Sequence, residues 1–239
     1  MLFRSNFALP PLPPIAPSGL PSTIDPLKQP TLQLGLSGTY PVDITGVATL
    51  QFAADRGGDD PAVQFSSGGR TVTFIIPAGS NLATFEAPSL ALQTGTVAGL
   101  ITINVTFQAS GTNITPTPVP SQQVRIPSSA PVITALRATR SGTQIQVFVT
   151  GYSTTREMTQ AVFRFNPASG ANLQTGDVTV PVSAIFTTWY SSADATPFGG
   201  QFTFTQPFNI QGDPAAVTSV TVTMTNSVGN STPVSANIQ

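Results

Sequence analysis

Short runs of alternating apolar and polar residues, separated by turn-forming residues, limit most strongly what this chain can fold into. From Ile101 to Phe107, isoleucine, valine and phenylalanine occupy every second position, and threonine or asparagine the positions between. This period of two is the pattern of a strand with one buried face. About seven such runs in each half, with Gly, Pro, Asn and Asp between them, predict β-sandwiches.

Expected strands run through both halves of the chain. In the first half they are Thr31–Leu36, Val47–Ala54, Ala62–Phe65, Arg70–Ile76, Leu82–Glu86, Val97–Gln108 and Gln122–Ile126. In the second half they are Val132–Thr139, Gln144–Gly151, Gln160–Phe165, Asp177–Val180, Gly200–Phe208, Val217–Asn226 and Val234–Ile238. The one helical pattern is Val182–Tyr190, where apolar residues recur with the spacing i, i+3, i+4, i+7, and it predicts a short helical turn.

The length and the proline distribution predict the domain organisation. A chain of 239 residues corresponds to two domains of ~100–150 residues. Residues 10–30 are rich in proline and are expected to form an extended spacer of polyproline II type. The predicted fold class is therefore all-β, with two tandem sandwich domains at 31–127 and 128–239. An extended Pro-rich N-terminal segment, residues 1–30, precedes them.

The residues that most catalytic and metal sites need are absent from this chain. It has no histidine and no cysteine, and charged residues make up 8% of it against a usual ~25%. Proton transfer at neutral pH relies on histidine first, and covalent catalysis commonly on a serine or cysteine paired with histidine. Transition metals are held mainly by imidazole and thiolate groups. We therefore predict a protein with no enzymatic activity, no catalytic residues and no cofactor.

The charge balance also limits the classes of partner that we expect for this chain. The formal net charge is −1 and the arginines are dispersed, whereas binding of nucleic acid requires clustered Lys and Arg. No apolar run approaches the ~18 residues of a membrane-spanning helix. A surface with so little charge is weakly protected against self-association. We expect other copies of the same chain as partners, with neither nucleic acid nor a membrane span.

Several segments carry a resemblance to a known family type. They are Ser37–Val42, Gly69–Phe74, Ile76–Gly79, Leu92–Gly99 and Thr225–Gly229. With them, residues 31–239 resemble the tandem immunoglobulin-like modules of bacterial secreted and cell-surface proteins. The resemblance implies an extracellular or cell-surface location. Such modules serve as spacers, adhesins and subunits of pilus-like fibres, so the resemblance points to the fold more than to one function.

Three aspartates form a weak calcium candidate. Asp55, Asp59 and Asp60 lie within six residues of one another in a glycine-containing loop, and calcium prefers several oxygen ligands in such a loop. The spacing matches no EF-hand, however, and Arg56 lies inside the cluster. We therefore expect an ordinary solvated loop and no metal site.

Two aromatic residues are candidates for contact with a glycan. Trp189 and Tyr190 are adjacent and could form a stacking platform for sugar rings. The alternative is that they fill the core or pack between modules, which is the commoner use of aromatic residues in small β-sandwiches. The sequence favours this packing role.

The segment around residues 113–117 is a candidate for glycosylation. Asn113 begins an Asn-Ile-Thr acceptor sequence that ends at Thr115. Thr115 and Thr117 also lie in a Thr- and Pro-rich stretch, which is a composition typical of O-glycosylated segments.

The N-terminal segment gives the sharpest functional hypothesis. If residues 1–9 are extended, Phe3, Phe7 and Leu9 fall on one face, with Arg4 and Asn6 on the other. We expect this segment to add as a strand to a neighbouring copy, with the alternative that it packs on its own domain. The predicted function is a structural subunit of an extracellular bacterial filament that polymerises head to tail. The alternative is a carbohydrate- or surface-binding adhesive module.

Overall fold

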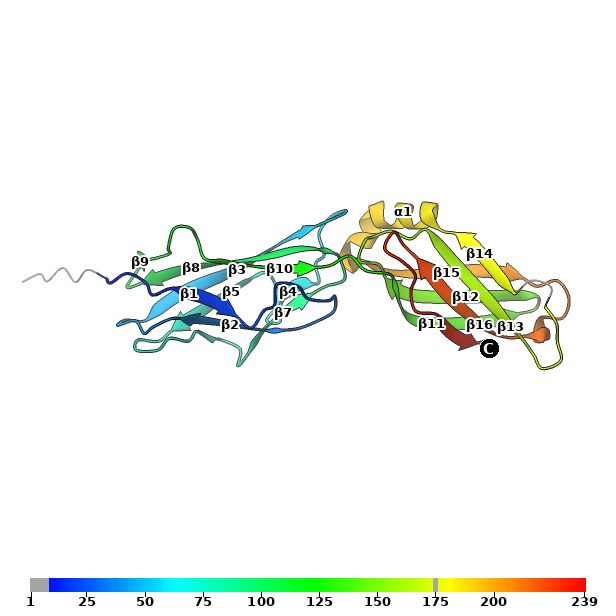
Figure 1. Cartoon of the computed structure of the whole chain (residues 1–239), viewed down its shortest axis with the longest axis horizontal. Helices are drawn as coiled ribbons and strands as arrows, with labels where there is room; N and C mark the ends of the chain where they lie inside the picture. Colours follow the sequence, from blue (N-terminus) through cyan, green and yellow to red (C-terminus); the bar gives the residue numbers. More distant parts are fainter. Residues whose placement is uncertain (1–8, 174–175) are drawn as a thin grey trace, which may run out of the picture. The chain divides into compact units, whose positions relative to one another are not determined.

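The structure, a computed structural model, describes residues 9–173 and 176–239 of the chain. Strands dominate the described residues, and one α-helix and two short 3₁₀-helices accompany them (Figure 1). The predicted all-β fold class is therefore confirmed. The chain divides into two compact units. Unit 1 comprises the residues up to Ala53, Val63–Thr94 and Leu100–Arg125, and unit 2 comprises Ala54–Ala62, Gly95–Gly99 and the residues from Ile126 onward.

Unit 1 contains two sheets that each bury one face. One sheet has the strand order β1-β2-β7-β4, and the other has the order β10-β8-β3-β5-β6 with β9 beside β8. The strands are β1 (Ile15–Ser18), β2 (Thr31–Leu36), β3 (Ile44–Ala54), β4 (Val63–Phe65), β5 (Thr71–Ile76), β6 (Thr84–Phe85), β7 (Leu90–Thr94), β8 (Gly99–Ala109), β9 (Thr112–Asn113) and β10 (Ser121–Ile126). The sequence patterns had not indicated β1, β7 or β9.

The long strand β8 shows why the alternating runs fold as they do. Ile101, Ile103, Val105 and Phe107 are all buried, as their spacing predicts. The residues between them are less buried and face the other side of the sheet. Since β-branched residues pack well on a half-buried pleated surface, this strand contributes a full row of side chains to the core of unit 1.

The proline-rich segment is not a separate spacer, contrary to the sequence-based expectation. β1 pairs antiparallel with β2 from Ile15↔Leu36 to Ser18↔Gln33. Further along, Ile24 N donates to Arg125 O on β10 at 2.9 Å. Proline lacks a backbone donor but is tolerated in edge strands, where the missing N–H can face outward. Pro17 therefore lies in an edge strand of unit 1, and the segment around it is not a free polyproline arm.

Unit 2 also contains two sheets. Their strand orders are β11-β12-β15 and β14-β13-β16-β17. The elements are β11 (Val132–Ser141), β12 (Gln144–Tyr152), β13 (Gln160–Pro167), β14 (Asp177–Pro181), α1 (Ser183–Ser191), η1 (Ala193–Phe198), β15 (Gln201–Asn209), η2 (Pro214–Ala216), β16 (Val217–Thr225) and β17 (Val234–Asn237). Val147, Phe163 and Val222 from three of these strands are fully buried in one core cluster.

The strand connections of both units are those of immunoglobulin-like sandwiches. In unit 2, β11-β12-β15 corresponds to strands A-B-E, and β14-β13-β16-β17 to C′-C-F-G. In unit 1, β1-β2-β7 corresponds to A-B-E, and β10-β8-β3-β5 to G-F-C-C′. In both units, the N-terminal part also forms a parallel bridge to the C-terminal end of the opposite sheet. Thr23 bridges to Arg125 in unit 1, and Ala138 bridges to Ile238 in unit 2.

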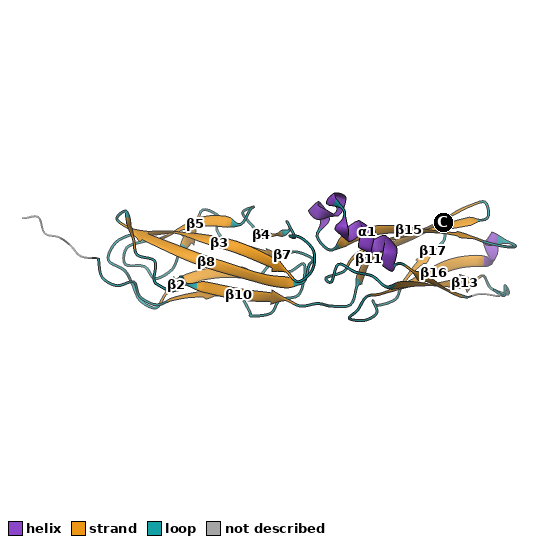
Figure 2. Cartoon of the chain, turned by 90° about the horizontal axis from the view of Figure 1, so that it is seen from above, coloured by secondary structure: helices purple, strands orange, loops and turns teal. Residues whose placement is uncertain are grey.

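The predicted helical turn is confirmed as the nine-residue helix α1, which connects β14 to η1 and β15. Figure 2 shows it as the principal helical element among strands. Phe186 is its buried residue and packs against Phe202 at 5.0 Å between ring centroids. Because this is the only fully buried side chain of the helix, α1 covers one side of unit 2 and leaves its outer face to solvent.

Candidate functional site

The N-terminal end of the described chain is tied to unit 1. The Tyr40 hydroxyl donates to the carbonyl oxygen of Pro10 at 2.8 Å, and Tyr40 itself is 2% exposed. Ser37 N donates to Pro14 O at 2.9 Å. Leu9 is half-buried, whereas Phe3 and Phe7 lie outside the described residues. The chain is therefore attached to unit 1 from Pro10 onward, and the long free spacer that the sequence predicted is not present there.

Strand β5 has an edge that no strand covers over part of its length. β3 pairs with β5 from Thr71 to Ile76, but on the other side β6 pairs only with Phe74 and Ile75. In an antiparallel pair, every second residue of a strand directs its backbone groups toward the same neighbour. Leu50 N donates to Arg70 O, so Arg70 faces β3, and Thr71 and Thr73 direct their backbone groups away from β3. Within the part of the chain that the structure describes, no strand lies beside these two residues.

A hollow of about 260 Å³ lies next to this uncovered edge. Val72, Phe85, Ala87 and Leu90 supply its apolar lining. Val72 belongs to the inward-facing side of β5 but is only half-buried. The core of unit 1 is thus less completely closed here than at its centre.

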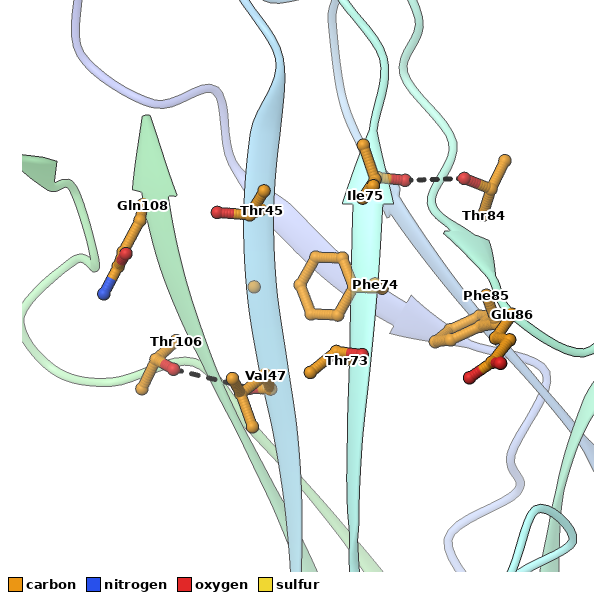
Figure 3. Close-up of a pocket in the computed structure, with 11 residues that line it drawn as sticks. Thr45, Val47, Thr73, Phe74, Ile75, Thr84, Phe85, Glu86, Thr106 and Gln108 are labelled. Carbon is orange, nitrogen blue, oxygen red and sulfur yellow. Dashed lines mark hydrogen bonds between the residues drawn. The ribbon is translucent and has the colours of Figure 1, made fainter. Parts of the chain in front are cut away.

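A larger hollow of about 530 Å³ adjoins the same strands (Figure 3). Thr73, Phe85 and Glu86 line both hollows. In Figure 3 the ring of Phe74 lies between β3 and β5, with Phe85 on the other side of β5. The Phe74 ring contacts those of Phe85 and Phe107 at 6.2 and 5.5 Å between centroids. The contact between Phe74 and Phe85 packs the short strand β6 against β5.

The aspartate loop does not have the structure that its composition suggested. Asp60 is 0% exposed, so the expectation of a solvated loop is wrong for this residue. Its carboxylate accepts from Thr96 N at 2.7 Å and from Ala62 N at 3.0 Å. Among the described residues, no group of three or more acidic side chains is placed to hold a metal ion. The Asp60 oxygens serve to fix the loop within unit 2.

Arg156 completes this buried polar cluster and was not singled out from the sequence. It is 7% exposed and has a positive φ of 50°. Its guanidinium donates to carbonyl oxygens of Gly58, of Asp59 at 2.6 Å, and of Gly199 at 3.1 Å. Burial lowers the pKa of Arg156, although the nearby Asp60 opposes that shift. No local pattern marks this role, because the partners come from segments distant in sequence.

The structure separates the two candidate glycan-contact residues. The Tyr190 hydroxyl donates to Gly200 O at 2.8 Å, and burial raises the pKa of Tyr190. Trp189 is half-buried, and its indole N–H donates to Gln201 O at 3.2 Å. Its ring lies 6.0 Å from that of Phe198, which is 50% exposed. Tyr190 is therefore committed to the fold, whereas Trp189 retains an accessible side.

The candidate glycosylation residues differ in accessibility. Asn113 is exposed at the end of β9, and its side-chain oxygen accepts from Thr115 N at 2.9 Å. The Thr115 hydroxyl is engaged with the backbone of Phe107, accepting from its N–H at 2.8 Å. Thr117 is exposed. Glycosylation at these positions stays a prediction.

None of the helices in the described ranges is long and apolar enough to cross a bilayer.

Comparisons with known proteins give structural similarities without a sequence family. No protein-family model matches the chain, and no curated protein matches its sequence. One similar solved structure is the class 5 fimbriae chaperone CfaA, with 9% identity, a TM-score of 0.33 and coverage of 95% of this chain and 99% of that one. Another is the Salmonella enterica SafA pilin in complex with the SafB chaperone, with 13% identity, a TM-score of 0.31 and coverage of 95% and 97%.

A third similar structure comes from an animal protein. It contains the FN1–FN3 domains of chicken CNTN1, with 12% identity, a TM-score of 0.27 and coverage of 96% of this chain and 68% of that one. Since all three TM-scores lie below 0.5, no functional conclusion rests on them. The strand connections themselves define the chain as an all-β protein with two immunoglobulin-like sandwiches.

Proposed function

We propose that this chain is a non-enzymatic structural subunit of an extracellular bacterial filament. In this proposal the N-terminal segment of one copy adds as a strand to the next copy. The observation that carries it is the uncovered edge of β5 at Thr71–Thr73, beside the hollow lined by Val72 and Leu90. Residues 1–9 have the complementary pattern, an apolar aromatic face that would point into the hollow while the backbone pairs with β5.

The expected gains from strand addition are of the same size as the costs of association. Burial of each large apolar side chain contributes ~1.5–3 kcal/mol, and each backbone hydrogen bond ~0.5–1.5 kcal/mol. Association costs roughly 4–15 kcal/mol in lost translational and rotational freedom. Ordering the donor strand costs further conformational entropy. Because gains and costs are of similar size, loss of one or two aromatic anchors should prevent assembly.

The attachment at Tyr40 defines how far the donor segment can reach. At ~3.3 Å per residue, nine extended residues span about 30 Å from the Pro10 carbonyl. This reach suits contact with a directly adjacent copy. A donor and an acceptor at different places on one chain make a heterologous contact, and such contacts form an open filament unless the rotation closes a ring.

The first experiment removes the donor strand. Deletion of residues 1–9, or the double change Phe3→Asp and Phe7→Asp, should abolish polymers seen by electron microscopy. Circular dichroism melting should show that both sandwiches remain folded. The matched control, Arg4→Ala with Asn6→Ala, alters the opposite face and should polymerise normally. Filaments of normal length from the truncated chain would contradict the proposal.

The second experiment tests the acceptor edge. Thr73→Pro removes an N–H that points away from β3, so β5 should persist while strand addition fails. Thr73→Val keeps that N–H and should assemble. A mixture of the Thr73→Pro chain with the chain lacking residues 1–9 should stop at a heterodimer, since only one donor and one acceptor are intact. Filaments formed by the Thr73→Pro chain alone would exclude β5 as the acceptor.

A further inference from the structure

An aromatic pair on unit 2 is held in a fixed arrangement although it is partly exposed. Trp189, near the end of α1, and Phe198, at the end of η1, lie 6.0 Å apart with a tilt of 34° between their rings. The indole N–H donates to Gln201 O at 3.2 Å, and the Trp189 carbonyl accepts from the Ser192 hydroxyl at 2.7 Å. The Trp189 ring is thus positioned before any ligand binds. Half of the Phe198 surface is exposed to solvent.

The groove beside this pair has polar groups that the fold does not use. It holds about 360 Å³ and is lined by Thr150, Trp189, Phe198, Gln201, Phe202 and Thr203. Thr150 and Thr203 are direct cross-strand partners of β12 and β15. Among the described residues, the side chains of Thr150, Gln201 and Thr203 have no hydrogen-bond partner, and all three residues are exposed. Two hydroxyls and an amide are therefore available to a ligand in the groove.

The electrostatics of the groove restrict the ligand class. Of the described residues, none that lines the groove is charged. A ligand with a phosphate or carboxylate group would lose its hydration water in the groove without contacting a cationic side chain, which is unfavourable. A purely apolar ligand would leave the hydroxyls and the amide desolvated and unpaired. The ligand that fits has an apolar face for the rings, hydroxyl groups along its edge and no charge.

We propose that this groove binds a neutral carbohydrate, with Trp189 and Phe198 contacting the C–H face of a sugar ring. Thr150, Gln201 and Thr203 would exchange hydrogen bonds with its hydroxyls. A volume of about 360 Å³ lies at the lower end of ligand-pocket sizes, roughly 300–1,000 Å³, and accommodates one or two sugar rings. Tyr190 takes no part, because its hydroxyl is bound to Gly200 O.

The inference is independent of the filament proposal, because none of the groove residues belongs to the donor segment or to β5. The chain without residues 1–9 should bind sugar as well as the full chain does. A failure of strand addition and a failure of sugar binding are therefore distinguishable.

The test uses the fluorescence of Trp189, the single tryptophan of the chain. The full chain is titrated with neutral hexasaccharides of glucose, mannose, galactose and N-acetylglucosamine, each in a separate series. At least one should produce a saturable emission change with a Kd of about a millimolar or tighter, as expected of a shallow site with few contacts. Absence of saturable change with all four at about 10 mM would overturn the proposal.

Three variants locate the binding. Phe198→Ala should raise the Kd about tenfold, since one of two ring contacts is lost. Ile185→Ala changes another residue of α1 that is 50% exposed but does not line the groove, and should leave the Kd unchanged. Thr203→Val removes one hydroxyl at nearly constant shape and should weaken binding several-fold. Equal affinities for the wild type and Phe198→Ala, or tighter binding of an acidic hexagalacturonate, would place the ligand elsewhere.

Discussion

Arg156 and Asp60 are charged residues that are buried inside unit 2 because backbone groups replace the water that they lose. Arg156 donates to three carbonyl oxygens of the loop at residues 56–59 and to Gly199 O, and Asp60 accepts backbone N–H groups of Ala62 and Thr96. Planar guanidinium suits such a set of acceptors because it has five donors in a fixed fork. At the scale of residues, unit 2 is thus fixed by directed polar contacts as well as by apolar packing.

A nearby carboxylate predicts how stability depends on pH. Burial alone would raise the pKa of Glu157, but hydrogen bonds from Ser227 and the ion pair with Arg56 outweigh burial and lower it. A lowered pKa in the folded state stabilises the fold above the unfolded pKa, and this contribution disappears as pH falls through the folded value. The stability advantage of the wild type over Glu157→Gln should therefore shrink below about pH 5.

The measurement is urea unfolding of wild type and Glu157→Gln at a series of pH values from neutral to acid. Both chains share all other carboxylates, so the effect of those groups on stability cancels when the two urea midpoints are subtracted. Arg56→Ala keeps the carboxylate but loses its ion-pair partner, so the folded pKa of Glu157 is lowered less and acidification should remove less stability than in the wild type. A midpoint difference that does not change with pH would contradict this assignment.

At the scale of elements, the contact between β3 and β5 depends on a missing side chain. A Cβ atom at Gly46 would lie 2.6 Å from the backbone oxygen of Thr106 and 2.7 Å from Cε1 of Phe74. The Phe74 ring occupies this space and packs on Phe107. Because a backbone oxygen cannot move aside without shifting β8, the glycine is required for the close approach of these strands.

Gly46→Ala should therefore lower the free energy of unfolding by ~1–3 kcal/mol, the usual cost of overpacking a core. Gly38→Ala is the matched control, because a Cβ there meets no atom within 4 Å. It should change the stability by less than ~1 kcal/mol. Chemical denaturation of both variants gives the comparison, and equal stabilities would show that the Phe74 packing is not tight.

At the scale of the whole molecule, the chain has little charge with which to repel copies of itself. Its net charge is −1 and only 8% of its residues are charged. The proposed contact between copies consists of backbone pairing and apolar side chains. Electrostatic attraction should therefore contribute little to assembly.

This prediction is tested by light scattering of assembling chain at about 50 and 500 mM sodium chloride. Screening shortens the Debye length from about 14 to about 4 Å over this range, but it acts only on charge interactions. The critical concentration for assembly should change less than about twofold. A chain lacking residues 1–9 serves as the non-assembling baseline. A large increase of the critical concentration with salt would instead indicate an ion-paired interface.

The sequence by itself determined the fold class and most of the strands. The alternation in Ile101–Phe107 and the absence of long helical patterns were sufficient, because the burial of every second side chain is a local property of a strand. The spacing of apolar residues in Val182–Tyr190 was likewise sufficient to predict α1. Proline misled the prediction at residues 10–30, since the same residue suits a free polyproline arm and an edge strand.

Only the tertiary structure decided the roles of the candidate site residues. Asp60 and Arg156 are distant in sequence, and no local pattern indicates that a loop carbonyl or a threonine N–H will replace water around them. Trp189 and Tyr190 are neighbours in sequence, yet one borders a groove and the other is bound to Gly200 O. Adjacent residues of a helix point about 100° apart, so burial of one says little about the other. Such roles depend on which distant segments meet, and that is decided by the packing of the sheets.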